Sequence, residues 1–335
     1  MTASPAPRAL HRLARWLGIG VLLFGVAALA ASLSGRQAPI DVVGTTAKRL
    51  GLPLESRMIP TNGIRLHVVL AGPADGPPVL LLHGYPEFWW GWHEQIARLA
   101  RAGFRVIAPD QRGYDASDKP DGVDAYRVDL LLGDMLGLMQ QLGYTQVNLA
   151  GHDWGGAIAW YLAIEHPERV RKLVMFNAAH PLAWRDAQQE GPKEATISWY
   201  RTFFQLPVVP ELTGRAGNWW LLVTNLRDTS RPGTFPDADM DLYRYAWDRD
   251  DAMHFMVNWY RAAFRHPHTV GGDGMVRVPT RIVWGMKDRF FENRMARLSL
   301  KHCADASLVE LDDATHWLLH EEPERTSQEM IAFFR

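Results

Sequence analysis

Residues 146–165 read QVNLAGHDWGGAIAWYLAIE, and this stretch decides the fold. Residues 146–150 are typical of a buried strand, and we expect a helix over residues 155–165. Between them lie Gly151 and five further residues, GHDWGG in all. A strand that passes through Gly-x-nucleophile-x-Gly into a helix forms a nucleophile elbow, because small flanking residues permit a tight turn. The sequence therefore predicts that Asp153, the middle residue, is exposed at the tip of that turn.

Strands and helices alternate on both sides of this turn. We expect further strands at residues 64–70, 78–82, 105–108, 172–176, 280–284 and 307–311. We expect further helices at residues 92–102 and 130–142 and a terminal helix through Phe334. Such alternation is typical of βαβ units, so we predict an α/β protein with a mostly parallel sheet and helices on both faces.

The alternation lapses over residues 181–275, which are helical in pattern, aromatic and punctuated by proline. This segment is expected as a helical lid inserted between two strands, which divides the α/β core into residues 57–180 and 276–335. The lid aromatics fit either an apolar pocket roof or the packed core of a helical lobe. They are Trp184, Trp199, Phe203, Phe204, Trp219, Trp220 and Trp259.

Composition excludes several classes of protein. The 335 residues are 47% hydrophobic and 22% charged, which is a globular composition. Thirty-six basic and 37 acidic residues nearly cancel, so the chain has no electrostatic footprint for nucleic acid. The single cysteine, Cys303, excludes an intrachain disulfide framework and a cysteine-rich zinc site.

The N-terminal part, residues 1–35, contains an apolar segment that could meet a membrane. Residues 16–35 read WLGIGVLLFGVAALAASLSG and carry no charge. At ~1.5 Å per residue, a helix of this length crosses a hydrocarbon core of ~30 Å. Arg8, Arg12 and Arg15 precede it and favour a cytoplasmic N-terminus. We expect a retained single-pass membrane anchor, followed by a linker with a short helix over residues 36–56.

Two other interpretations of residues 16–35 stay open. A cleaved signal peptide has the same basic and apolar regions, and residues 28–30 (ALA) are suitable for cleavage, which would export the protein. A buried core helix is the third interpretation. In the first two cases these residues lie outside the α/β fold.

An aspartate at the elbow has a chemical consequence. Most enzymes with this turn have serine where Asp153 stands. An ionised carboxylate can displace a leaving group at saturated carbon without first losing a proton, and the product is an alkyl ester that water must cleave. The alternative is that Asp153 is an ordinary turn or N-cap residue.

Two further residues follow in the order that elbow enzymes use, which is nucleophile, acid, histidine. Asp288 comes just after the strand expected at 280–284, and His316 just after the strand expected at 307–311. The carboxyl ends of parallel strands meet at one edge of the sheet, so the three side chains should converge. His316 would then activate the hydrolytic water and Asp288 would orient its ring. His320, one turn further on, is a rival base.

Cleavage of an ester also calls for an oxyanion hole. His83-Gly84-Tyr85-Pro86 follows the strand expected at 78–82, where such folds supply one backbone N–H, and the residue after the nucleophile supplies another. The expected donors are the amides of Tyr85 and Trp154.

With these motifs the chain resembles the epoxide hydrolases of the α/β-hydrolase fold, close to their membrane-anchored group. The resemblance spans residues 57–335. It is carried by HGYPEFWWGW (83–92), APDQRGYDASDKP (108–120), GHDWGG (151–156), NWYRA (258–262), GMKD (285–288) and THW (315–317). The chain departs from the family pattern in having Tyr85 where phenylalanine is common and Asp115 where glycine is usual.

The resemblance implies a cofactor-free and metal-free enzyme that converts an apolar epoxide and water to a vicinal diol. Asp153 would be the nucleophile, with His316 and Asp288 as the charge-relay pair. Two lid tyrosines would donate hydrogen bonds to the epoxide oxygen. Tyr260 in NWYRA matches one, and Tyr200 in WYRTFFQLP matches the other, with Tyr243 and Tyr245 as further candidates.

Two alternative functions remain open at this point. A haloalkane or haloacid dehalogenase would use the same Asp-His-Asp chemistry, but indole N–H groups such as that of Trp154 would hold the leaving halide. A membrane-tethered binding protein could keep the fold without turnover, although the complete set of three residues argues against it.

Overall fold

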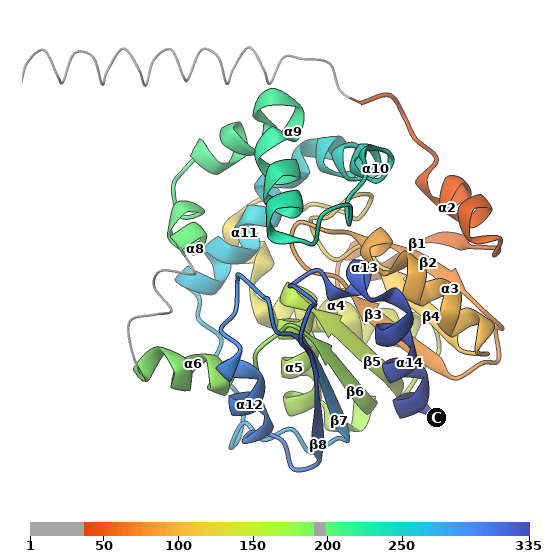
Figure 1. Ribbon diagram of the computed structural model, residues 1–335, viewed down its shortest axis with the longest axis vertical. Helices are drawn as coiled ribbons and strands as arrows, with labels where there is room; N and C mark the ends of the chain where they lie inside the picture. The colour runs from red at the N-terminus through yellow and green to blue at the C-terminus, as the bar shows by residue number, and fades with distance from the viewer. Residues whose placement is uncertain (1–36, 191–198) are drawn as a thin grey trace, which may run out of the picture.

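The computed structural model describes residues 37–190 and 199–335, and these build one eight-stranded sheet between helices (Figure 1). The strand order is β1-β2-β4-β3-β5-β6-β7-β8. The strands are β1 (Glu55–Thr61), β2 (Ile64–Ala71), β3 (Pro78–Leu82), β4 (Arg105–Pro109), β5 (Val147–His152), β6 (Val170–Phe176), β7 (Thr280–Gly285) and β8 (Ala306–Leu311). β1 and β2 pair antiparallel, as do β2 and β4, and all other pairs are parallel. The predicted α/β class with a mostly parallel sheet is therefore confirmed.

The strand that sequence reasoning missed is β1, at the edge of the sheet. Most of its side chains are exposed and it contains Pro60, which cannot donate to a ladder. The central strands β3 and β5, in contrast, are buried along almost their whole length and read as apolar runs. The edge position thus explains why β1 lacks the pattern that located the other strands.

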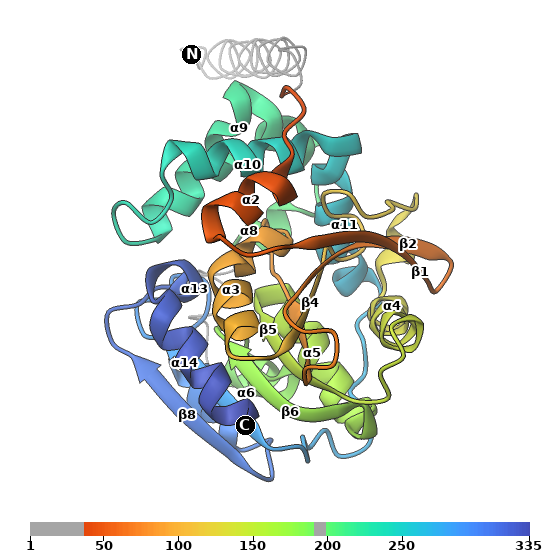
Figure 2. The ribbon, with the colours of Figure 1, turned by 90° about the vertical axis from the view of Figure 1, so that its right-hand side faces the viewer.

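Helices cover both faces of the sheet. On one face α3 (His93–Arg101) packs against α14 (Pro323–Phe334), beside the short α13 (Leu318–Glu321). On the other face α4 (Val128–Gln141) packs against α5 (Asp153–Glu165), and α12 (Arg294–Leu300) lies against β8. Figure 2 shows α3 and α14 side by side in front of the sheet, with the C-terminus of the chain at the end of α14. The sheet is therefore the middle layer of three, and its central strands are buried from solvent.

The lid segment lies between β6 and β7. It contains α6 (Pro181–Gln189), α8 (Trp199–Phe203), α9 (Val209–Thr229), α10 (Asp237–Asp248) and α11 (Ala252–Arg265). Figure 1 shows α9, α10 and α11 stacked above the carboxyl ends of the parallel strands. α9 is interrupted, because the backbone over residues 216–219 leaves helical geometry. The lid thus closes the edge of the sheet at which the motifs converge.

The segment expected as a linker holds α2 (Val42–Leu50), which packs on both the core and the lid. The side chain of Asp41 caps it by accepting a hydrogen bond from the amide of Gly44. Thr46 accepts a hydrogen bond from the indole of Trp90 at 3.0 Å, and Arg49 forms an ion pair with Asp239 of α10. Residues 41–50 are therefore part of the folded body.

The apolar segment 16–35 lies outside the described residues. Over residues 37–190 and 199–335, no helix combines the length and the apolar character needed to cross a membrane.

Candidate active site

β5 runs directly into α5, and Asp153 stands at the junction. Its φ is +50°, a left-handed value that is uncommon for a residue with a side chain and that concentrates at functional sites. A Cβ at Gly84 would lie 2.7 Å from Asp153 Oδ1, and one at Gly156 would overlap Ala178. Glycine is thus required where the turn meets its neighbours, as the elbow motif predicts.

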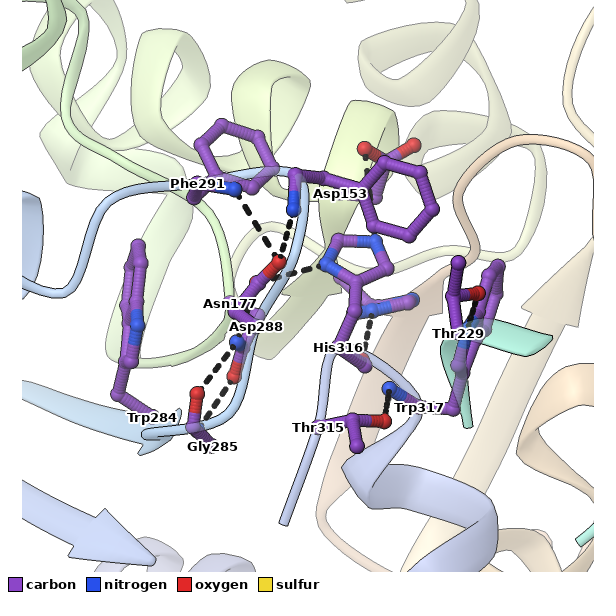
Figure 3. Close-up of polar contacts among 12 residues, drawn as sticks. Asp153, Asn177, Thr229, Trp284, Gly285, Asp288, Phe291, Thr315, His316 and Trp317 are labelled. Carbon is purple, nitrogen blue, oxygen red and sulfur yellow. Dashed lines mark hydrogen bonds and ion pairs between the residues drawn. The ribbon is translucent and has the colours of Figure 1, made fainter. Parts of the chain in front are cut away.

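The three residues expected to act together are close in space (Figure 3). His316 Nδ1 lies 2.9 Å from Asp288 Oδ2, which is a hydrogen bond, and Nε2 lies 3.8 Å from Asp153 Oδ2. The side chains of Asp288 and His316 are almost entirely buried, whereas that of Asp153 is 12% exposed. One ring nitrogen therefore faces the acid and the other faces the nucleophile.

Asn177, which sequence reasoning missed, holds Asp288 in place. It follows β6 directly, and its Nδ2 donates to Asp288 Oδ2 at 2.5 Å while its Oδ1 accepts from the amide of Gly285 at 2.7 Å. The amides of Phe290 and Phe291 donate to the other oxygen, Oδ1 (Figure 3). A polar residue directly after a strand at this sheet edge was the signal available in the sequence.

Charges shift the acid and the base in opposite directions. Burial opposes a charged imidazole, but the carboxylates of Asp288 and Asp153 outweigh it and raise the pKa of His316. Burial likewise opposes a charged Asp288, yet His316 and the hydrogen bond from Asn177 outweigh it and lower the pKa of that carboxyl. The site thus stabilises positive charge on His316 and negative charge on Asp288.

The expected oxyanion donors adjoin the nucleophile. The amide of Tyr85 donates to Asp153 Oδ1 at 2.8 Å. Trp154 is the second residue of α5, so its amide belongs to the first turn and has no partner within the helix. The Tyr85 amide therefore lies where negative charge on the Asp153 carbonyl would develop, and the N-terminal end of α5 adds a favourable dipole.

Tyr260 of α11 and Tyr200 of α8 line a cavity together with Asp153. The Tyr260 ring contacts those of Trp154, Tyr85 and Tyr200 edge to face, with centroids 5.0–5.9 Å apart. Within the described residues the Tyr260 hydroxyl has no hydrogen-bond partner. Burial, with the charge of Asp153, raises the pKa of Tyr260 well above 10, so the phenol keeps its proton.

The other two candidate tyrosines lie elsewhere. Tyr243 donates a hydrogen bond to Glu87 at 2.6 Å behind the elbow, and Tyr245 accepts one from Arg249 at 3.1 Å. Neither lines the cavity. The structure therefore pairs Tyr200, not these two, with Tyr260.

The cavity has a volume of about 670 Å³, enough for a drug-sized ligand. Its inner wall is largely apolar, and Arg185 and Arg201 line it farther along α6 and α8. Most of the apolar lining comes from Trp154, Ala157, Ala178, Leu182, Trp184, Ala263 and Phe291. A mostly apolar ligand is thus able to reach Asp153.

His320 is engaged in a buried network behind the elbow. Its Nε2 lies 2.6 Å from Glu87 Oε1, and Glu87 Oε2 lies 3.4 Å from His152 Nδ1. His152 in turn contacts the carbonyl of His316 at 2.9 Å. Burial opposes ionisation of Glu87, but His320 and His152 outweigh it and lower its pKa well below 4.5. His320 is therefore not placed as a base toward Asp153.

One cluster, His67, Asp110 and Asp115, has the ligand types and spacing for a metal ion. However, His67 Nδ1 already lies 2.6 Å from Asp110, and its Nε2 lies 2.8 Å from Ser56 Oγ. Both ring nitrogens are thus used in hydrogen bonds, which fits a structural network better than a metal site. Asp115 has φ of +34°, and an aspartate tolerates this geometry where glycine is usual.

Comparisons with known proteins agree with this geometry. Residues 77–323 match the α/β-hydrolase fold family. The chain is 41% identical to the AB hydrolase superfamily protein YfhM of Bacillus subtilis, over 84% of this chain and 98% of that protein. It is 33% identical to epoxide hydrolase 1 of Caenorhabditis elegans, over 83% and 70%, and to epoxide hydrolase 4 of Mus musculus, over 83% and 78%.

A solved structure of a Bacillus megaterium epoxide hydrolase in complex with an inhibitor superposes on this fold with a TM-score of 0.76. It is 28% identical and is covered to 99%, against 83% of this chain. The resemblance drawn from the motifs is confirmed, and the chain belongs to the epoxide hydrolase family of the α/β-hydrolase fold.

Proposed function

We propose that this protein hydrolyses an apolar epoxide to a vicinal diol through a covalent alkyl ester on Asp153. The observation that carries the proposal is that Asp153 and two lid tyrosines, Tyr200 and Tyr260, face one largely apolar cavity, with His316 beside Asp153. An acid, a base and a nucleophile then surround the place where a small ring would bind.

In the first step an Asp153 oxygen attacks one ring carbon. The new C–O bond forms as the ring C–O bond breaks, and its electron pair goes to the epoxide oxygen. Tyr260 and Tyr200 donate hydrogen bonds to that oxygen and deliver a proton as it becomes a hydroxyl. Because the pKa of Tyr260 is raised, this phenol is reliably protonated when the substrate arrives.

In the second step His316 removes a proton from water, and the oxygen of that water attacks the ester carbonyl of Asp153. The amides of Tyr85 and Trp154 stabilise the oxyanion. The acyl C–O bond to the diol then breaks, the diol oxygen takes the proton of the added hydroxyl, and Asp153 regains a carboxylate that carries one oxygen from water. The proton held by His316 finally returns to the tyrosine that gave up its own proton in the first step. Esterification removes the negative charge of Asp153, one of the factors that raise the pKa of His316, so ester formation lowers that pKa and favours the neutral imidazole that hydrolysis needs.

The dehalogenase alternative needs indole N–H groups that converge on a halide. Among the lid tryptophans, Trp259 donates to the carbonyl of Arg112 at 2.9 Å and Trp219 to Asp248 at 2.8 Å. Neither indole N–H is thus directed at Asp153. Trp154 and Trp184 are the indoles that do line the cavity, and it is the two phenols there, Tyr200 and Tyr260, that support epoxide opening over halide release.

The decisive experiment is a single turnover of the full-length protein in H₂¹⁸O with an aryl epoxide. We expect ¹⁸O in the Asp153 carboxylate and none in the first diol, because water attacks the carbonyl and not the epoxide. Intact mass of His316→Gln should show the epoxide added to the chain, and Asp153→Ala is the control that cannot form the ester. Direct incorporation of ¹⁸O into the first diol would refute the ester mechanism.

We also propose that residues 16–35 anchor the protein in a membrane by a single pass. The support is the sequence alone, an uncharged stretch of membrane-spanning length after three arginines. Retention of the intact N-terminus, with resistance of the full-length protein to alkaline extraction from membranes, is the expected result. A mature N-terminus near residue 31 would replace the anchor with a cleaved signal peptide.

A further inference from the structure

Large apolar side chains are exposed almost exclusively on the lid. In the described residues eight such side chains are exposed, and seven of them lie between residues 199 and 264. They are Trp199, Leu206, Val208, Val209, Trp220, Leu221 and Phe264, and the eighth is Met58 on β1. Single exposed apolar residues are ordinary, but a group confined to one segment indicates an interaction site.

Two adjacent tryptophans in α9 show that the exposure follows from the backbone. Asn218 and Trp219 have left-handed φ values of +57° and +65°. Trp219 is 2% exposed, donates its indole N–H to Asp248 and packs on Trp247, whereas Trp220 is 64% exposed. The irregular turn thus directs one indole into the lid and the next one outward.

The N-terminal end of the described chain lies at this same turn. The side chain of Gln37 donates to Asn218 Oδ1 at 2.9 Å, and its amide donates to Asp248 at 3.1 Å. Figure 2 shows this end of the chain rising toward α9 and α10. Only Arg36 separates Gln37 from the apolar segment 16–35, so any membrane that holds this segment must begin close to Trp220.

We propose that the lid surface formed by Leu206, Val208, Val209, Trp220 and Leu221, here called the lid face, docks on the lipid bilayer. The inference rests on the proposed anchor of residues 16–35. Indole and aliphatic side chains are favoured at the boundary between headgroups and acyl chains. The anchor removes most of the entropic cost of bringing the lid face to the bilayer, so a modest apolar area is sufficient.

Docking would also place the substrate entrance near the lipid. Exposed Trp199 directly precedes Tyr200, and exposed Phe264 directly follows Ala263, and both Tyr200 and Ala263 line the catalytic cavity. An apolar epoxide concentrates in the acyl region of a bilayer. The enzyme would therefore take its substrate from the membrane rather than from water.

The test uses full-length protein reconstituted in phosphatidylcholine vesicles, in a Cys303→Ser background with one fluorophore attached to an introduced cysteine. Trp220→Cys is compared with Met58→Cys, an equally apolar exposed site on the sheet. We expect lipids with a nitroxide headgroup to quench the label at 220 and to leave the label at 58 unaffected.

The outcomes separate the two membrane proposals. Flotation with vesicles and equal quenching at both sites would overturn docking and leave the anchor intact. Failure to float would overturn the anchor and, with it, docking. Energy transfer between labels at position 220 of two chains, without quenching by the nitroxide lipid, would show that a second copy covers the lid face, which also overturns docking on lipid.

A kinetic test needs no label. For the Trp220→Ser/Leu221→Ser variant we expect KM for an epoxide delivered in vesicles to rise about tenfold, because two large side chains lose apolar burial in the bilayer. kcat, and KM for a water-soluble epoxide, should stay unchanged. Met58→Ser is the matched control. An unchanged KM for the vesicle-borne epoxide in the double variant would contradict the proposal.

Discussion

The core and the lid hold their functional side chains in different ways. In the core, Asp288 accepts hydrogen bonds from Asn177 and from the amide of Phe290, and its carboxylate in turn holds one ring nitrogen of His316. In the lid, Tyr260 is positioned by the edges of aromatic rings, and its hydroxyl has no partner within the described residues. A base needs one fixed orientation, whereas a proton donor to varied epoxides benefits from a less constrained setting.

The largest effect should follow from removing the charge that holds the base. Asp288→Asn keeps the shape but cannot stabilise the imidazolium, so kcat should fall about 10⁴-fold. Diol formation at saturating epoxide measures the loss. An unchanged melting temperature is the control for folding, and a loss below tenfold would mean that Asp288 does not act in the reaction.

The lid should contribute less than the core, but to a different step. Tyr260→Phe is expected to slow ester formation about 10²–10³-fold, as for loss of one donor to a developing oxyanion. Tyr200→Phe should have a smaller effect, because Tyr200 is only partly buried whereas Tyr260 is buried, and a hydrogen bond is worth more away from water. Rapid-quench detection of the alkyl-enzyme separates this step from hydrolysis. Slowed hydrolysis with normal ester formation would contradict the assigned role.

The pH dependence follows from the raised pKa of His316. Hydrolysis needs the neutral imidazole, so its rate should be constant above that pKa and fall about tenfold per pH unit below it. Asp288→Asn removes the charge that raises the pKa, so the remaining activity should persist to lower pH. The decay of preformed alkyl-enzyme measured across pH checks this. If the fall in rate at low pH begins at a higher pH in Asp288→Asn than in the wild type, the assigned role of Asp288 is contradicted.

A smaller loss of kcat is expected when Asn177, which donates a hydrogen bond to Asp288, is replaced. Asn177 has φ of +36°, so glycine suits the backbone better than alanine, and Asn177→Gly removes only the side chain. With one hydrogen bond to Asp288 lost, kcat should fall about tenfold. KM should not change, since Asn177 does not line the cavity. A change in KM alone would place Asn177 in substrate binding.

The smallest effect on catalysis should come from the contact that joins lid and core. Tyr243→Phe removes a hydrogen bond to the buried Glu87 and should cost about 1–3 kcal/mol of unfolding free energy. kcat should change less than about threefold, because Glu87 keeps its contacts with His320 and His152 and does not line the cavity. Urea unfolding and diol formation, measured together, test this. A large kcat loss without destabilisation would move Tyr243 into the catalytic machinery.

Sequence reasoning succeeded where a residue could be recognised from its immediate neighbours and from its order among the strands. Asp153 is flanked by glycines that only an elbow requires, and Asp288 and His316 each follow a strand that parallel topology brings to the same edge. Three features were not predicted, namely β1 at the sheet edge, Asn177 beside Asp288 and the network around Glu87. Asn177 and Glu87 depend on partners distant in the chain, whereas β1 pairs with the adjacent β2 and was missed because its exposed edge position leaves no apolar pattern.

The order of motifs and the periodicity of apolar residues are properties of the chain, because both can be read from the sequence without knowing which segments pack together. They were sufficient for the α/β class, the elbow and the family resemblance. The partner of Tyr260 was different, since Tyr200, Tyr243 and Tyr245 all lie in lid helices of similar composition. Their directions depend on how those helices pack on the sheet. Long-range packing alone placed Tyr200 in the cavity, Tyr243 on Glu87 and Trp220 at the surface.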